Sequence, residues 1–445
     1  MKLRRSALAV LGALALAMLA GCSSGGSAGS GSAGSAASSS SSGVVHLEYW
    51  TWWPTASSIV DVWNKSHPNI QVTAENAGQG SSIQYSKLAA AVQAGQGPDL
   101  ALAEYEWMPA YVTGGIAADI SQYTGQIKSA YSQSVWNLVA FGDGVYGVPL
   151  DQGPMAYMYR SDLLAKYGLT PPKTWQEFAA DAKIVHTKDP SVYLANFNPT
   201  DAEFFAGLAR QAGAQWYQND DGTWQVGIND AASKSVADFW NNLIKQGLVL
   251  AQPTGTPQYN KLVSEGKVLS VPGGSWNMTS HNFSAIAANT IGKWQVAPLP
   301  QWTAGDASVS FAGGSATIVT KTSKHPKEAM EFLSWLGAST GGDTAIVQRG
   351  GNLPASNVGL QVFKALPATS KQAVYGQSTY GSVMLAAASN TRLVTWGPNT
   401  NVAFTAYTDA IGKAITNHTS LSEALDSVQQ ATVSDLKNRN YKVKD

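Results

Sequence analysis

The chain has 445 residues, a length that predicts two or three domains, and its 44% hydrophobic and 13% charged residues argue against a disordered chain. Lys and Arg total 29, as do Asp and Glu, so the sequence has no basic surplus with which to bind nucleic acid or an anionic lipid surface. We therefore expect a neutral ligand and no nucleic-acid partner.

Residues 1–21 predict a secretory signal peptide. Met1–Arg5 is basic, and the apolar run Ser6–Leu19 is too short to be a comfortable membrane span. The tetrapeptide Leu19-Ala20-Gly21-Cys22 resembles the lipobox of bacterial lipoproteins, which implies that Cys22 becomes the lipidated first residue of the mature chain. The alternative is an ordinary signal peptide with a chance cysteine. Because Cys22 is the only cysteine, we expect no disulfide and no thiolate metal site in the folded part.

The segment after Cys22 predicts a tether. Residues 23–43 contain only Ser, Gly and Ala, and such a coil has an end-to-end span of roughly 25 Å. With Cys22 it forms a predicted tether, residues 22–43, that connects a lipid anchor to a folded body beginning near Val44. Three basic residues precede Cys22, so the mature chain carries 26 basic and 29 acidic residues.

The folded body opens with alternating strand and helix patterns. Strands are predicted at Val45–Trp50 and Ile70–Thr73, and a buried strand at Leu100–Ala103. A helix around Ile59, Val62 and Trp63 separates the first two strands, and a helix at Leu88–Ala94 precedes the third. This order predicts an α/β fold with a parallel sheet covered by helices.

Later helices are predicted from their first residues. Thr174 and Ser420 each precede a Glu by three residues, as in a capping box, and Ser161 is expected to cap a helix that ends before Gly168. Pro326 suits the first turn of a helix that buries Ala329, Phe332, Leu333 and Leu336. Further strands are expected at Lys267–Val271 and Thr317–Thr320. Four Trp residues at core-facing helical positions are expected to pack in the interior: Trp63, Trp175, Trp240 and Trp335.

Short motifs occur in a consistent order along nearly the whole folded body. They are Val60–Val72, Ala94–Leu100, Gly115–Ile120, Tyr146–Pro149 with Tyr157–Arg160, Pro171–Phe178, Glu265–Lys267 with Gly274–Trp276, Pro298–Pro300 and Asn352–Ala355. In this order they resemble the extracellular solute-binding proteins of ABC importers, specifically the sugar-binding group that includes maltose-binding protein. Arg160 departs from the pattern, because the family often has Asn there.

The resemblance implies a two-lobed, periplasmic-binding-protein-like α/β fold with a hinge and a ligand cleft between the lobes. Residues 44–150 and 312–354 are expected to form lobe 1, and residues 151–311 and 355–445 lobe 2. It further implies a monomer without a cofactor, which closes around a carbohydrate and delivers it to a membrane permease whose ATPase is a separate subunit.

A carbohydrate site requires aromatic planes for the sugar faces and convergent polar groups for the hydroxyls. Loops at the carboxyl ends of parallel strands are where such sites form. On this reasoning the first candidates are Trp52, Trp53, Glu104, Tyr105, Glu106, Trp107, Asp151 and Gln152. The alternatives are lobe packing for the Trp pair, a solvated loop for residues 104–107 and a structural hinge for Asp151.

Trp276, followed by Asn277, is the strongest single candidate. Two glycines precede it, which allows the backbone to approach a ligand, and the family commonly places a stacking aromatic here. Gly313 and Gly314 are candidates for the same reason, because they too would let the backbone approach a ligand where the chain is expected to pass between the lobes. Further candidates for ligand contact are Trp216, which equally suits a surface hairpin, and Trp302, Arg349 and Trp396.

The sequence gives little support to an enzyme. Glu104 and Glu106 are too close in sequence to suit the two carboxylates of a glycosidase, which act across a scissile bond several ångströms apart. The six His residues are scattered, so no metal site is expected, and the chain lacks a Gly-x-Ser-x-Gly elbow and a phosphate-binding loop for ATP. We therefore expect a lipid-anchored carbohydrate-binding protein, located outside the cytoplasm on the outer face of the bacterial cytoplasmic membrane. The alternatives are a binding lipoprotein for a peptide or cell-wall fragment, or a structural or adhesive surface lipoprotein.

Overall fold

The computed structural model describes residues 43–78, 81–278, 290, 292–366, 377–392 and 395–444. The chain divides into two units, Met1–Ser42 and Gly43–Asp445, and the second contains all of the structure described below. The predicted signal peptide, Cys22 and the tether up to Ser42 lie outside the described residues.

The first part of the body confirms the predicted parallel sheet. Strands β1 (Val45–Thr51) and β2 (Ile70–Asn76) pair in parallel, and β1 also pairs in parallel with β3 (Leu100–Glu104). Helices α1 (Ala56–Ser66) and α2 (Ser81–Gln93) connect them. Parallel strands need such crossovers, because a tight turn cannot return the chain to the same edge.

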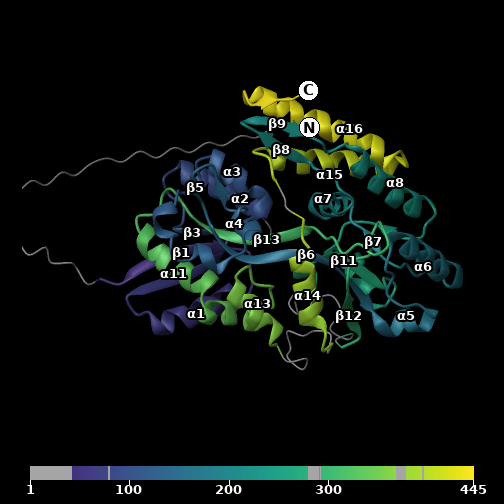
Figure 1. Ribbon diagram of the computed structural model, residues 1–445, viewed down its shortest axis with the longest axis horizontal. Helices are drawn as coiled ribbons and strands as arrows, with labels where there is room; N and C mark the ends of the chain where they lie inside the picture. The colour runs from purple at the N-terminus through teal and green to yellow at the C-terminus, as the bar shows by residue number, and fades with distance from the viewer. Residues whose placement is uncertain are drawn as a thin grey trace, which may run out of the picture. The chain divides into compact units, whose positions relative to one another are not determined.

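Two long strands extend this sheet. The strand order is β11-β6-β13-β3-β1-β2, and β12 also pairs with β6. The first half of β6 (Val148–Arg160) pairs with β13 (Phe311–Val319), and its second half pairs with β11 (Ser270–Gly274) and β12 (Trp294–Ala297). All three pairings are antiparallel, so the complete sheet is mixed (Figure 1). Every residue of β6 and β13 is buried, which places both strands between packed layers on both faces.

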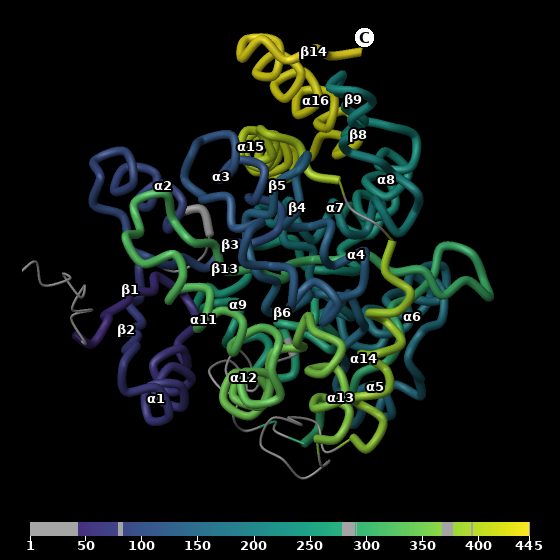
Figure 2. Tube along the Cα trace, turned by 60° about the vertical axis from the view of Figure 1, so that its left-hand side comes forward, coloured from purple at the N-terminus to yellow at the C-terminus, as the bar shows by residue number. Residues whose placement is uncertain are grey.

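The remaining elements surround this sheet. The other helices are α3 (Met108–Thr113), α4 (Gln133–Trp136), α5 (Ser161–Tyr167), α6 (Trp175–Lys188), α7 (Ala202–Gln211), α8 (Ala231–Lys245), α9 (Pro257–Ser264), α11 (Pro326–Ala338), α12 (Thr340–Ala345), α13 (Asn357–Lys364), α14 (Tyr380–Ser389), α15 (Thr400–Asn417) and α16 (Leu421–Asn438). Short strands are β4 (Ala140–Phe141), β5 (Gly144–Val145), β7 (Asn196–Phe197), β8 (Tyr217–Asp220), β9 (Thr223–Val226), β10 (Leu250–Ala251) and β14 (Lys442–Val443). The helices α15 and α16 pack side by side (Figures 1 and 2).

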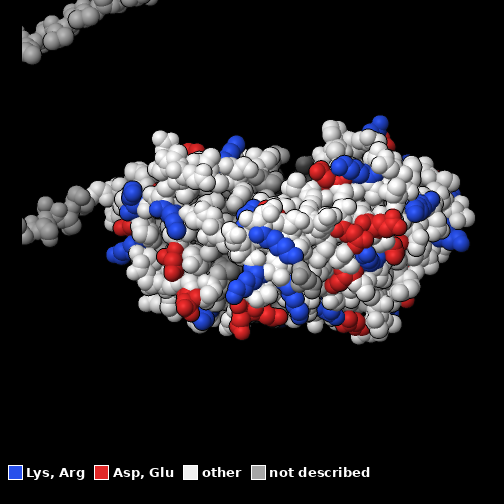
Figure 3. Space-filling view, turned by 90° about the horizontal axis from the view of Figure 1, so that it is seen from above, with Lys and Arg blue, Asp and Glu red and all other residues white. Residues whose placement is uncertain are grey.

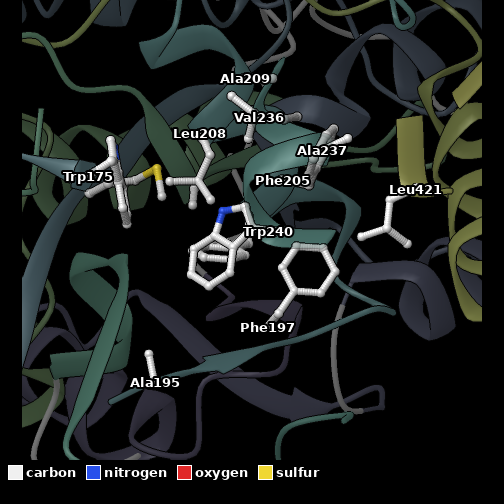
Figure 4. Packing of buried hydrophobic residues seen from close by; sticks show 14 of the residues in the cluster. Trp175, Ala195, Phe197, Phe205, Leu208, Ala209, Val236, Ala237, Trp240 and Leu421 are labelled. Carbon is white, nitrogen blue, oxygen red and sulfur yellow. The ribbon is translucent and has the colours of Figure 1, made fainter. Parts of the chain in front are cut away.

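Two large hydrophobic cores lie along this sheet. The first packs β1, β3 and the start of β6 against α1 and α11, and it includes Trp63 and the predicted α11 residues Ala329, Phe332, Leu333 and Leu336. The second gathers α6, α7, α8, α15 and α16 around Trp175 and Trp240, which are fully buried (Figure 4). Their rings lie 5.8 Å apart, and Phe197 packs 5.4 Å from Trp240. Trp335 is half-buried against the first core, so the packing role predicted for these Trp residues is confirmed.

Two local predictions need correction or adjustment. Ser161 does not cap α5, because Arg160 occupies the N-cap position and the Ser161 hydroxyl donates to the carbonyl of Lys293 instead. The strand predicted at Lys267–Val271 begins later, at Ser270, because Val268 bridges Tyr193 before the chain reaches β6. Gly168 does end α5, in a left-handed conformation.

Among the residues that the structure describes, no helix combines the length and the apolar character needed to cross a lipid bilayer. On the face drawn in Figure 3, basic and acidic side chains are interspersed, and neither sign covers the face.

Candidate functional site

A cavity of about 430 Å³ lies between elements of the two cores. On one side are residues at the end of β3 and in the following 3-10 turn Tyr105–Trp107, which belong to the first core. On the other side are the start of α7 and the first half of α15, which belong to the second. The lining residues are Glu104, Glu106, Trp107, Asn198, Thr200, Asp201, Ala202, Glu203, Asn401, Phe404, Thr405, Thr408 and Asp409.

The local sequence explains how these side chains reach the cavity. β3 ends at Glu104, which pairs with Ser315 of β13, and the 3-10 turn that follows places Glu106 and Trp107 in the lining of the cavity. Asp201 caps α7 by accepting a hydrogen bond from the Phe204 N–H at 2.9 Å. This cap fixes the start of α7, and Glu203 in its first turn lines the same cavity as Glu104.

A smaller cavity of about 40 Å³ adjoins the first. Asn198, Asp201 and Glu203 line both cavities, and the smaller one continues to Trp276, Asn277 and the end of β11. The Trp276 indole N–H donates to the Ala312 carbonyl at 3.0 Å, which fixes the ring against β13. The two cavities therefore form one continuous polar and aromatic surface.

Acidic side chains dominate this surface. Five carboxyl residues line the larger cavity, and none of the described residues that line either cavity is Lys or Arg. Burial raises the pKa of Glu106 well above its usual range, and the nearby carboxylates of Glu203 and Glu104 raise it further. Burial also raises the pKa of Glu203, with Glu104 and Asp201 adding to the effect, although Glu203 accepts a hydrogen bond from the Gly313 N–H. In the described part of the chain, no group of His, Cys, Asp and Glu side chains has the arrangement to hold a metal ion.

These shifts make the folded protein less stable as the pH rises. Above the ordinary glutamate pKa of 4.5, the unfolded chain releases protons that Glu106 and Glu203 retain in the fold, so the free energy of unfolding falls with increasing pH. Glu203→Gln keeps an acceptor for the Gly313 N–H but removes the carboxyl group that would ionise in the unfolded chain. We expect it to raise Tm at pH 7.5 by about 1 °C for each 1 kcal/mol of stabilisation, because the unfolding entropy of about 2.1 cal/mol/K per residue scales with the size of the folded unit Gly43–Asp445. The gain should shrink toward pH 4, as measured by differential scanning calorimetry.

The control for this measurement is Glu331→Gln, which removes an exposed carboxylate on α11. Its Tm should equal that of the wild type at both pH 7.5 and pH 4. Equal or lower stability of Glu203→Gln at pH 7.5 would show that the carboxyl cluster imposes no charge penalty.

The structure gathers several predicted site residues around the two cavities. Glu104, Glu106 and Trp107 line the larger cavity, and Trp276 and Asn277 line the smaller one. Gly313 and Gly314 lie in β13 with φ of +85° and +105°, where the register against β6 is irregular, and a Cβ on Gly313 would clash with the Trp276 ring. The glycines thus shape the backbone beside the site.

Three other predicted residues make hydrogen bonds that connect β6 to its neighbours, namely the 3-10 turn after β3, β13 and the segment at Asn352–Pro354. Asp151 is buried and accepts hydrogen bonds from Ser315 N–H at 2.8 Å and from the Asn352 side chain at 2.6 Å. The Gln152 side chain donates to the Pro354 carbonyl at 3.0 Å, and the Tyr105 hydroxyl donates to the Asp151 carbonyl at 2.9 Å. Burial raises the pKa of Asp151, while these donors to its carboxylate oppose the rise.

The remaining predicted residues lie elsewhere and line neither cavity. Trp52 and Trp53 are half-buried against the first core. Trp216 is fully buried in the second core, and Trp302 packs 5.4 Å from Trp175. Trp396 is buried beneath the guanidinium of Arg210, and Arg349 is exposed.

Sequence reasoning missed the contributions of α7 and α15. The contribution of α7 had a signal in the sequence. Asp201 and Glu203 come soon after the short strand β7, and Asp is a residue type that favours the N-cap position that Asp201 occupies. Phe404, Thr405, Thr408 and Asp409 lie on one face of α15 and carry no local signal that separates them from a surface face.

The chain matches known proteins over most of its folded body. Residues 54–342 match the family model described as bacterial extracellular solute-binding protein. An arabinooligosaccharide-binding protein of Bacillus subtilis (strain 168) is 23% identical over 293 residues, covering 64% of this chain and 66% of the relative. A lactose-binding protein of Rhizobium radiobacter is 29% identical over 215 residues, covering 46% and 48%. The matched segments therefore span about two thirds of the first relative and about half of the second.

Solved structures match more of the chain. The galacto-N-biose/lacto-N-biose I-binding protein of the Bifidobacterium longum ABC transporter, in complex with lacto-N-biose, has a TM-score of 0.81 and 29% identity, covering 90% of this chain and 99% of that one. An ABC transporter-associated binding protein from B. animalis subsp. lactis Bl-04, in complex with β-1,6-galactobiose, has a TM-score of 0.81 and 26% identity, covering 90% and 100%. These similarities confirm the predicted two-lobed α/β fold.

Proposed function

Because this chain belongs to the family of bacterial extracellular solute-binding proteins, whose members bind solutes and do not transform them, we propose that it captures a carbohydrate for an ABC importer. The cavity between the two cores is the observation that carries this proposal. Its position agrees with ligand capture between two lobes, and the two solved structures described above are complexes with lacto-N-biose and β-1,6-galactobiose.

The cavity has the chemistry that a carbohydrate requires. Its volume of about 430 Å³ falls within the roughly 300–1,000 Å³ of small-molecule pockets. Trp107 and Phe404 supply aromatic surface from opposite sides, and Trp276 supplies a third ring in the adjoining cavity. Among the described residues, Oδ1 of Asn401 is buried and accepts no hydrogen bond, so a ligand hydroxyl can satisfy it. These features suit a short oligosaccharide better than a single sugar ring.

We assign residues 44–150 and 312–354 to lobe 1 and residues 151–311 and 355–445 to lobe 2. β6 and β13 then carry the hinge, since β6 changes partners along its length and β13 contains Gly313 and Gly314 in the left-handed region. A ligand that contacts both lobes favours the closed state by its higher affinity for that state. The permease would receive the ligand from the closed form.

Localisation is part of the same proposal. Cys22 carries the lipid anchor, residues 23–43 form the tether, and the body remains on the outer face of the cytoplasmic membrane. The lipobox-like sequence and the composition of the tether support this assignment. Radiolabelled palmitate should enter the wild-type chain in its bacterial host and not Cys22→Ser.

The first experiment is a ligand screen on Gly43–Asp445. Tm and tryptophan fluorescence are measured against mono- and oligosaccharides, with amino acids and peptides as controls. A ligand at a hundred times its Kd stabilises the fold by about 2.7 kcal/mol, so we expect a clear saturable shift with one group of oligosaccharides. A response to peptides alone would exclude the carbohydrate proposal, and no response to any solute would favour a structural or adhesive lipoprotein.

A further inference from the structure

Arg210, the last cation of α7, is buried without an anionic partner. The residue is 5% exposed, and its Nη1 atom is buried and makes no hydrogen bond. No carboxylate among the described residues forms an ion pair with it. The contact that its guanidinium does make is with the face of Trp396, whose ring centre lies 5.0 Å from Cζ. A cation–π contact alone leaves most of the desolvation cost of a buried cation uncompensated.

Arg210 lines a cavity that is separate from the candidate carbohydrate site. The cavity has a volume of about 380 Å³ and is lined by Arg210, Gly213, Ala214, Gln215, Tyr217, Gln218, Arg392 and Thr395. It shares no lining residue with the two cavities of the candidate carbohydrate site. Trp396 and Phe404, whose rings pack edge-to-face at 5.8 Å, lie between Arg210 and the larger of those cavities.

A second cation reaches the same cavity. Arg392 makes two long polar contacts, an ion pair with Asp306 at 3.8 Å and a hydrogen bond to the Ser308 hydroxyl at 3.3 Å. Its Nη1 atom lies against the loop at Gly213, where an added Cβ would be 3.7 Å away. None of the described residues that line the cavity is acidic, in contrast to the five carboxyl residues of the carbohydrate site.

We propose that this cavity binds a free oxyanion, a phosphate, sulfate or carboxylate group, between Arg210 and Arg392. Guanidinium groups present paired N–H donors that match the oxygen spacing of such anions. The anion would lie beside Arg210 and would compensate a charge that no carboxylate of the described residues balances. The side chains of Gln215, Gln218 and Thr395 add polar groups at the rim.

Titration of the purified chain with inorganic phosphate, sulfate or acetate tests this proposal. Ionic strength is held constant with sodium chloride, and binding is followed by calorimetry and by Tm. We expect saturable binding of at least one of the three anions, with a preference for phosphate and sulfate if a tetrahedral dianion is the ligand and for acetate if a carboxylate is. No saturable binding of any of them would overturn the proposal.

Arg210→Met provides the decisive variant, because it keeps the apolar length of the side chain and removes the unpaired charge. We expect it to fold with an unchanged or higher Tm without anion and to weaken anion binding by at least about tenfold, the loss that follows from about 1.4 kcal/mol. Arg439→Met, which removes an exposed Arg that pairs with the half-buried Asp435 of α16, is the matched control and should bind the anion as the wild type does. Equal anion affinity of Arg210→Met and wild type would also overturn the proposal, since the anion would then bind elsewhere.

Discussion

Trp107→Ala is expected to weaken carbohydrate binding by about 30- to 1,000-fold, which corresponds to the loss of about 2–4 kcal/mol typical of a central buried aromatic anchor. Trp107 lines the larger cavity beside Glu104 and Glu106, and only 8% of its surface is exposed. Tyr85 packs 5.0 Å from its ring, so the indole is held in place before the ligand arrives. A ring already held in place loses little entropy on binding, which increases its net contribution.

Isothermal titration calorimetry with the oligosaccharide from the ligand screen measures this effect. Trp107→Phe should recover part of the affinity, because a smaller ring still covers part of a sugar face. The matched control is Trp335→Ala, which truncates a half-buried Trp of the first core that lines neither cavity. This variant should lose stability and keep its affinity. Wild-type affinity in Trp107→Ala would place the carbohydrate outside the larger cavity.

The sequence was sufficient where short-range patterns decide the structure. Alternation in β1, helical spacing in α1 and the buried run of β3 predicted the parallel sheet, because each element buries its own apolar face. The long strand β6 was harder to predict, since Gly153 and Pro154 interrupt it. Pro154 lacks an N–H but fits within the sheet because the opposite part of β13 is irregular between Phe311 and Gly314. The residues that accommodate Pro154 are about 160 positions away in the sequence, so no local sequence pattern predicts that this proline fits within a strand.

The candidate site was only half predictable for the same reason. The strand-end rule found Glu104, Glu106 and Trp107 on one side of the cavity. The opposite side comes from Glu203 and Phe404, which reach the cavity only after α7 and α15 have packed around the second core. Aromatic composition alone does not separate the two environments. Trp216 and Trp302 were candidates for ligand contact by residue type, but both pack against other aromatic rings of the second core.

Gly274→Ala is expected to destabilise the protein far more than Gly273→Ala, although the two residues are neighbours in β11. A Cβ on Gly274 would lie 2.0 Å from the Ala312 carbonyl oxygen, a backbone atom of β13 that cannot move without separating the crossing strands. A Cβ on Gly273 would meet only the end of the Asn277 side chain, at 2.7 Å, and that side chain can rotate away. Overpacking against a fixed backbone costs about 1–3 kcal/mol or more.

The same substitution should also weaken carbohydrate binding. Ala312, which the new methyl group would displace, is the residue whose carbonyl fixes the Trp276 ring beside the smaller cavity. Urea unfolding and calorimetry on both variants measure the two effects. We expect Gly274→Ala to show a lower urea midpoint and a higher Kd, and Gly273→Ala to unfold close to the wild type. Equal urea midpoints for the two variants would mean that β11 and β13 can separate at little cost. The crossing would then be a compliant hinge, and closure of the lobes would depend on the ligand rather than on this backbone contact.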